Sequence, residues 1–187
     1  NGSFNPGVSY STVNAKSPVE LATGDVTGDG KLDILVANQG SDNFTVYQNT
    51  GSGAFKPGVN VPTGLTSPQS LALADFNNDG KLDVVLASSN QSVVSVGLGN
   101  GDGTFQTTMM LATVLPGFLS GVTAADVNGD KRVDIIAVSG NSGIISLLLG
   151  NGDGNFQLAK NVGNASTSPT SIVAADVDGD QMLDLVT

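Results

Sequence analysis

The sequence predicts an all-β protein made of β-propeller blades, each a sheet of four antiparallel strands that spans about 50 residues. Three observations support this fold class. An aspartate-rich motif recurs along the chain, a glycine-rich turn that ends in Phe recurs at the same interval, and short apolar segments fill the space between them. The alternative is a β-sandwich with repeated hairpins, but a sandwich does not impose so regular a period.

The aspartate-rich motif occupies residues 24–33 and returns at 74–83, 125–134 and 175–184. Its leading aspartates are separated by 50, 51 and 50 residues. The glycine-rich turn keeps the same interval, and its aromatic residues are Phe4, Phe55, Phe105 and Phe156. Two markers that stay in phase over the whole chain indicate tandem copies of one structural unit.

Each repeat has room for four short strands, which we expect in the second repeat at 70–74, 82–88, 93–98 and 105–111. These segments are rich in Val, Leu, Ile and Ala, and they are bounded by Gly, Asn, Asp or Ser. The first of them carries Ala72 and Ala74, small residues that suit the crowded innermost strand of a propeller. No capped helical pattern interrupts the series.

We expect one domain over residues 1–187, with repeats at about 4–54, 55–104, 105–155 and a partial repeat at 156–187. Residues 4–10 match the fourth strand of a preceding blade. Three full blades follow, and then strands one and two of another. The sequence therefore predicts an incomplete or fragmentary propeller, either part of a larger ring or a chain that completes its ring by self-association.

The composition excludes several classes of function. There is no Cys and no His, which argues against zinc, haem, iron–sulfur and thiol chemistry and against Ser-His-Asp catalysis. Seven basic residues face seventeen acidic ones, for a formal charge of −10, so we expect neither nucleic acid nor an anionic membrane as a partner. No apolar stretch reaches the roughly 20 residues of a membrane-spanning helix. The chain opens on Asn1 without a visible signal peptide, which we interpret as a mature or excised segment.

The aspartate-rich motif reads Asp-x-(Thr/Asn/Asp)-x-Asp-x-x-x-Asp and lies between the first two strands of each repeat. Calcium prefers six to eight hard oxygen ligands, and the side chains at positions 1, 3, 5 and 9 together with the backbone carbonyl at position 7 offer such a set. We therefore expect up to four calcium ions. The candidate ligands are Asp25, Thr27, Asp29, Lys31, Asp33, Asp75, Asn77, Asp79, Lys81, Asp83, Asp126, Asn128, Asp130, Arg132, Asp134, Asp176, Asp178, Asp180, Met182 and Asp184.

Charge supports a cation site over ordinary turns. The four motifs hold thirteen of the seventeen acidic residues, which would repel one another without a cation, and four calcium ions would change the formal charge from −10 to −2. The motif is not an EF-hand, because it lacks the Glu at position 12 and the flanking helices. We expect the second loop to be well ordered, and the first to bind most weakly because Thr27 offers only a hydroxyl.

The glycine-rich turn contains its own aspartates, Asp102 and Asp153, but no partner carboxylate lies nearby in sequence. We interpret this turn as structural, with its Phe anchoring the fourth strand. The aspartate loops and the Gly-Asp-Gly-x-Phe turns together resemble the FG-GAP/VCBS repeat family, which includes the propellers of integrin α-subunits. The resemblance implies calcium ions on one face of a propeller of about seven blades. Thr27, Lys131 and Gln181 depart from the family motif.

The resemblance also implies a setting, because members of this family are mostly extracellular. We expect a calcium-binding module, extracellular or at the cell surface, that serves adhesion or recognition of a protein or glycan, with calcium in a structural role. The alternatives are a lectin propeller and a non-catalytic accessory domain of a secreted enzyme. A lectin is less favoured because the chain has no Trp and only two Tyr. We expect no enzymatic activity, since calcium binding explains every aspartate cluster.

Overall fold

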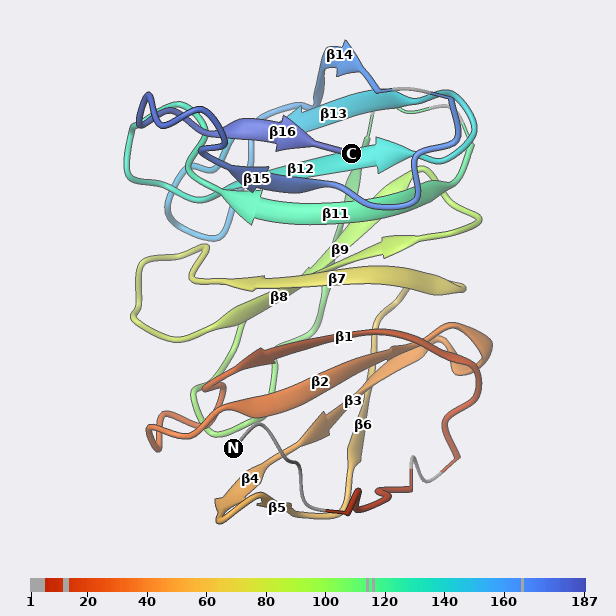
Figure 1. The fold of residues 1–187 in the computed structure, drawn as a ribbon, viewed down its shortest axis with the longest axis vertical. Helices are drawn as coiled ribbons and strands as arrows, with labels where there is room; N and C mark the ends of the chain where they lie inside the picture. Colours follow the sequence, from red (N-terminus) through yellow and green to blue (C-terminus); the bar gives the residue numbers. More distant parts are fainter. Residues whose placement is uncertain (1–5, 12–13, 114, 116, 166) are drawn as a thin grey trace.

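The computed structural model describes residues 6–11, 14–113, 115, 117–165 and 167–187, and these residues form a stack of antiparallel sheets (Figure 1). The first blade contains β1 (Pro18–Gly24), β2 (Asp33–Asn38), β3 (Asn43–Tyr47) and β6 (Val59–Pro62). The second contains β7 (Pro68–Ala74), β8 (Asp83–Ser88), β9 (Val93–Gly97) and β10 (Met109–Ala112). The third contains β11 (Leu119–Ala125), β12 (Asp134–Ser139), β13 (Ile144–Leu148) and β14 (Lys160–Asn164). A fourth sheet pairs β15 (Val173–Ala175) with β16 (Asp184–Val186).

Two smaller elements complete the described part of the chain, a 3₁₀ turn η1 (Gln39–Ser41) and a hairpin of β4 (Asn49–Gly51) with β5 (Ala54–Phe55). Strand order within each four-stranded blade follows the sequence, so every connection joins antiparallel neighbours. The predicted all-β class and four-stranded blades are confirmed. The described sheets form an open stack and do not close into a ring, as expected for an incomplete propeller.

The first strand of each blade lies beside the first strand of the next blade, from β1 to β7, β11 and β15 (Figure 1). Strands β1, β7 and β11 each carry an irregularity after their first residue. Small side chains follow it, such as Ala72 and Ala74, which allow neighbouring blades to approach closely. These strands form the innermost layer that the alanine pattern predicts.

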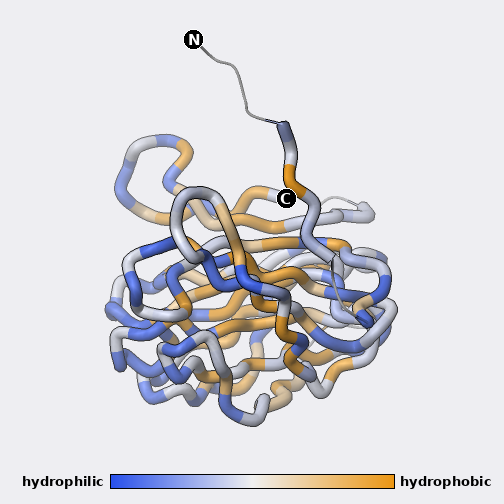
Figure 2. The backbone as a smooth tube through the Cα atoms, turned by 90° about the horizontal axis from the view of Figure 1, so that it is seen from below, coloured by the Kyte–Doolittle hydropathy of each residue, from blue (hydrophilic) through white to orange (hydrophobic). Residues whose placement is uncertain are grey.

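The core lies between the blades rather than within any one of them. Every residue of β8 is buried, since its two faces pack against different neighbours. Val84 and Leu86 join the core shared with the first blade, whereas Val85 and Ala87 join the core shared with the third. Figure 2 shows the apolar segments crossing the middle of the molecule, with hydrophilic segments gathered in the loops. Burial of both faces explains why the middle strands are continuous apolar runs.

Two expectations about fourth strands need correction. In the second blade the strand begins at Met109 instead of residue 105, because Phe105 forms an isolated bridge with Gly99 that closes the preceding turn. The strand expected at 4–10 does not form over residues 6–10, and residues 4 and 5 lie outside the described part. Tyr10 instead packs edge-on against Tyr47 and Phe55.

Candidate metal centre

The four aspartate loops each connect the first two strands of a blade, and all four lie along one edge of the stack, at the left in Figure 1. Positions in a loop are counted from its leading aspartate. This common edge follows from the fold, because each first strand runs in the same direction and ends where its loop begins. The expected placement of the loops between strands one and two is thereby confirmed.

The aspartate at position 1 organises the backbone of its own loop. In the first loop, Asp25 Oδ1 accepts a hydrogen bond of 3.1 Å from Asp29 N, and Asp25 Oδ2 accepts one of 2.7 Å from Gly30 N. Asp75 repeats the pattern with Asp79 N and Gly80 N. The backbone N–H of Gly30 is the largest influence that lowers the pKa of Asp25 below its ordinary value. This carboxylate therefore remains charged and holds the loop wrapped around it.

Position 6 has a left-handed backbone in all four loops. Gly30 and Gly80 adopt it with φ of 80° and 81°, whereas Lys131 and Gln181 adopt it with φ of 67° and 68°. A side chain in this region is strained, so the third and fourth loops have a less favourable residue at this turn. The sequence indicated this difference, because glycine occupies position 6 only in the first two loops.

The aspartate at position 9 joins two parts of its blade. In the second loop, Asp83 Oδ2 accepts from Phe76 N at 2.8 Å, and Asp83 Oδ1 accepts from Gly99 N in the glycine-rich turn at 2.7 Å. Asp33 and Asp134 make the equivalent pairs of contacts, and all three side chains are 0% exposed. Burial raises the pKa of Asp83 and of Asp134 above the ordinary value. These carboxylates are structural as well as candidate ligands.

Position 7 carries a basic side chain in three of the loops, and each pairs with the aspartate at position 5. Lys31 Nζ lies 2.6 Å from Asp29 Oδ2, and Arg132 Nη2 lies 2.8 Å from Asp130 Oδ2. The corresponding separation between Lys81 and Asp79 is 3.8 Å. In the fourth loop the residue is Met182, which offers no charge. The first three loops therefore contain a built-in counter-charge that a bound cation would displace or share.

The fourth loop brings three carboxylates together. Among the described residues, Asp176, Asp178 and Asp184 are a set of acidic groups whose ligand oxygens all lie within 4.8 Å of one another. Asp180 lies in the same loop, where its Oδ1 accepts from Met182 N. The donors are oxygen atoms of carboxylates, without nitrogen or sulfur, which fits a hard cation such as calcium. A calcium ion would be held here by the side chains of the fourth loop.

The glycine-rich turns of the second and third blades also contact the aspartate loop of the preceding blade. Gly103 N donates to Val26 O at 2.9 Å in the first loop, and Gly154 N donates to Phe76 O at 3.1 Å in the second. Asp102 consequently lies beside the first loop, where it lines a cavity with Thr27 and Asp29. These turns make structural contacts, as expected, but the contacts join them to the neighbouring blade. The spacing of residues within one repeat cannot predict a contact between two blades.

The aromatic residues of these turns pack between blades as well. Phe105 contacts Phe44 of the first blade edge-on, with ring centroids 5.2 Å apart, and Phe156 contacts Phe76 at 5.5 Å. Both turn residues are half-buried. They stabilise the contact between neighbouring sheets and hold each turn over the preceding loop.

The fold and these loops define the chain as a β-propeller repeat protein with open ends. A model of the FG-GAP-like repeat matches residues 25–86, 75–137 and 126–187. Since these matches span most of the sequence, the chain belongs to the FG-GAP-like repeat family. A search of curated protein sequences found no significant match.

Several solved structures have a similar fold. A lectin of Agrocybe aegerita that recognises non-reducing terminal N-acetylglucosamine is 26% identical with a TM-score of 0.60, over 87% of this chain and 44% of the lectin. The Tc holotoxin pore of Photorhabdus luminescens is 20% identical with a TM-score of 0.52, over 88% of this chain and 8% of that one. The biofilm matrix protein Bap1 of V. cholerae is 19% identical with a TM-score of 0.51, over 96% of this chain and 30% of that protein. The chain thus spans less than half the length of each of these proteins.

Proposed function

We propose that this chain is a calcium-stabilised β-propeller module that recognises an extracellular ligand. The observation that carries the calcium assignment is the convergence of Asp176, Asp178 and Asp184 within 4.8 Å, in a loop whose sequence pattern recurs in every blade. Membership of the FG-GAP-like repeat family supports the same assignment. Calcium would supply positive charge to the loops and so reduce repulsion between their carboxylates.

The role of calcium in this proposal is structural. The first and second loops receive hydrogen bonds from the turn of the next blade, so an ion that orders either loop also stabilises the contact between two sheets. Extracellular modules bind calcium with dissociation constants of about 10⁻⁴–10⁻³ M, which suits a calcium-rich medium. Recognition of a protein or glycan would then depend on surfaces that the ordered blades present. We propose no catalytic role for the aspartates.

The proposal is tested by calorimetric titration with calcium and with magnesium. We expect calcium to bind more tightly, because the irregular oxygen sets of the loops suit its flexible coordination. Asp178→Ala should reduce the number of bound calcium ions by one. The control is Asp153→Ala, which removes the same charge from a glycine-rich turn and should leave the number unchanged. Absence of calcium binding to the unmodified protein, or an unchanged stoichiometry in Asp178→Ala, would refute the assignment.

A second candidate function is carbohydrate binding. It is favoured by the similarity to the Agrocybe aegerita lectin, which shares the fold and 26% of aligned residues with this chain. The function of an accessory domain on a larger secreted protein is compatible with either candidate. Across the described residues, no helix has the length and apolar character needed to cross a membrane.

A further inference from the structure

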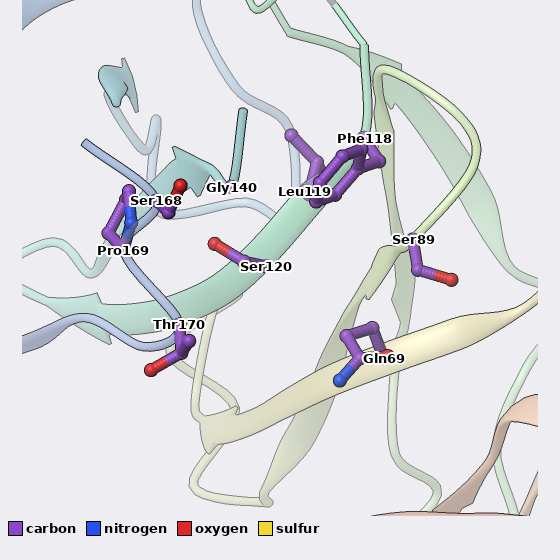
Figure 3. Close-up of a pocket in the computed structure, with 9 residues that line it drawn as sticks. All are labelled: Gln69, Ser89, Phe118, Leu119, Ser120, Gly140, Ser168, Pro169 and Thr170. Atoms are coloured by element: carbon purple, nitrogen blue, oxygen red, sulfur yellow. The ribbon is translucent and has the colours of Figure 1, made fainter. Parts of the chain in front are cut away.

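A cavity of about 390 Å³ lies at the opposite end of the inner strands from the aspartate loops (Figure 3). Its walls come from three consecutive blades, at the start of β7, the start of β11 and the segment before β15. The volume falls within the range of about 300–1,000 Å³ that is usual for small-molecule sites. The residues that line it include Gln69, Ser89, Phe118, Ser120, Gly140 and Thr170.

A change in the repeat opens this cavity. After its second strand, the first blade has Gln39, whose Nε2 donates to Gln69 Oε1 at 2.7 Å and to Ser89 Oγ at 3.1 Å. This side chain therefore bridges the first and second blades. The equivalent residues of the next two blades are Ser89 and Gly140, which are too short to make such a bridge. The space between the second, third and fourth blades stays open at the corresponding place.

A second change in the repeat places an aromatic ring in the wall of the cavity. Ser17, Ser67 and Ser168 each precede a Pro at the same position of the other repeats, whereas the third repeat has Phe118 there. The ring packs closely over the backbone of Gly140, where a Cβ atom would overlap it. Gly140 therefore allows the ring to take this position. Phe118 is nonetheless 39% exposed, so it presents apolar surface to the cavity instead of filling a core.

The remaining wall is uncharged and combines the apolar side chains of Leu119 and Pro169 with polar side chains. The hydroxyl of Ser120 and the amide of Gln69 lie on the sides of the cavity next to the ring, and Thr170 lies across the cavity from it (Figure 3). Within the described part of the chain, neither Thr170 Oγ1 nor Gln69 Nε2 has a hydrogen-bond partner. An aromatic face next to hydroxyl and amide groups suits a neutral ligand with one apolar face and several hydroxyls. A saccharide ring has both properties.

We propose that this cavity binds one terminal saccharide residue, with the C–H face of the sugar on the ring of Phe118. The hydroxyls of the sugar bond to Gln69 and Ser120. The proposal rests on the carbohydrate-binding candidate above and assigns it a site. It places the glycan at the opposite end of the inner strands from the aspartate loops, so calcium does not contact the sugar.

The test is calorimetric or NMR titration of the calcium-loaded protein with N-acetylglucosamine. Phe118→Ser introduces the residue of the other repeats and removes the ring, and it should weaken binding by about tenfold or more. Ser89→Gln introduces the side chain that bridges the first two blades, and it should fill the cavity and weaken binding as strongly. Leu158→Ser is the control, because it removes an apolar side chain that is exposed and lies outside the cavity.

The possible results distinguish a wrong assignment of the site from an absence of carbohydrate binding. If the unmodified protein binds the sugar and both cavity variants bind it equally well, the site is wrong while carbohydrate binding stands. If the unmodified protein binds neither N-acetylglucosamine nor any sugar on a glycan array, the site and the carbohydrate-binding candidate both fail. Calcium binding is measured separately and is unaffected by either result. Should Phe118→Ser not fold, Ser89→Gln alone decides the question.

Discussion

At the scale of single residues, the position-9 aspartates have the most demanding role. Asp83 is fully buried and accepts hydrogen bonds from two backbone N–H groups that are distant in sequence, Phe76 N and Gly99 N. Removing an acceptor from a buried donor costs the desolvation of that donor, about 1–3 kcal/mol for each group. The carboxylate therefore stabilises the blade whether or not a metal ion is bound.

We predict that Asp83→Asn lowers the free energy of unfolding by about 1–3 kcal/mol in the presence of a calcium chelator. An amide keeps the shape of the side chain but offers one acceptor in place of two. The measurement is urea denaturation followed by circular dichroism. Asp153→Asn is the matched control, because its exposed carboxylate accepts from Asn155 within its own turn and does not connect two parts of the blade. Equal stability of the two variants would contradict this stabilising role of Asp83.

The sequence identified the candidate residues of the loops but could not show how each one is used. Their spacing indicates that positions 1, 3, 5 and 9 can converge. It cannot show that Asp83 reaches Gly99, because that contact depends on how the third strand of the blade returns to the loop. Phe118 was missed for a different reason. The sequence does show that Phe118 replaces the Ser of a repeated Ser-Pro pair. Its place in the wall of the cavity follows only from the packing of its ring against Gly140.

At the scale of elements, the second and third blades each depend on a close approach between the glycine-rich turn and the start of the second strand. Gly99 and Gly150 lie against the backbone carbonyl oxygens of Leu82 and Val133, where a Cβ atom would overlap them. The same two glycines donate to the buried aspartates of their blades. A side chain at either position would overlap the backbone, so the second and third blades both require glycine there.

We predict that Gly99→Ala lowers the free energy of unfolding by about 1–3 kcal/mol, since the new methyl group forces the turn away from the strand. The control is Gly163→Ala in β14, where a Cβ atom would meet nothing within 4 Å. Thermal denaturation of both variants measures the difference. A Gly99→Ala variant as stable as Gly163→Ala would show that the turn moves without cost and that the contact is not essential.

At the scale of the whole molecule, stability is shared between neighbouring blades. The period of about 50 residues was enough to predict the number of blades and the inner position of the alanine-containing strands. It could not predict which side chains pack between blades, because every such contact joins residues from different repeats. Phe105 with Phe44 and Gly103 with Val26 are examples. Proteins of this kind behave as linked units, in which each unit stabilises the next.

The central claim is that calcium in the aspartate loops stabilises this stack of blades. The most direct measurement is the thermal unfolding midpoint of the unmodified chain at increasing calcium concentration, with magnesium and a chelator as references. A ligand that binds only the folded state stabilises it by about 2.7 kcal/mol per site at 100 times its dissociation constant. The midpoint should therefore rise continuously with calcium and much less with magnesium. An identical midpoint in calcium and in chelator would contradict the claim.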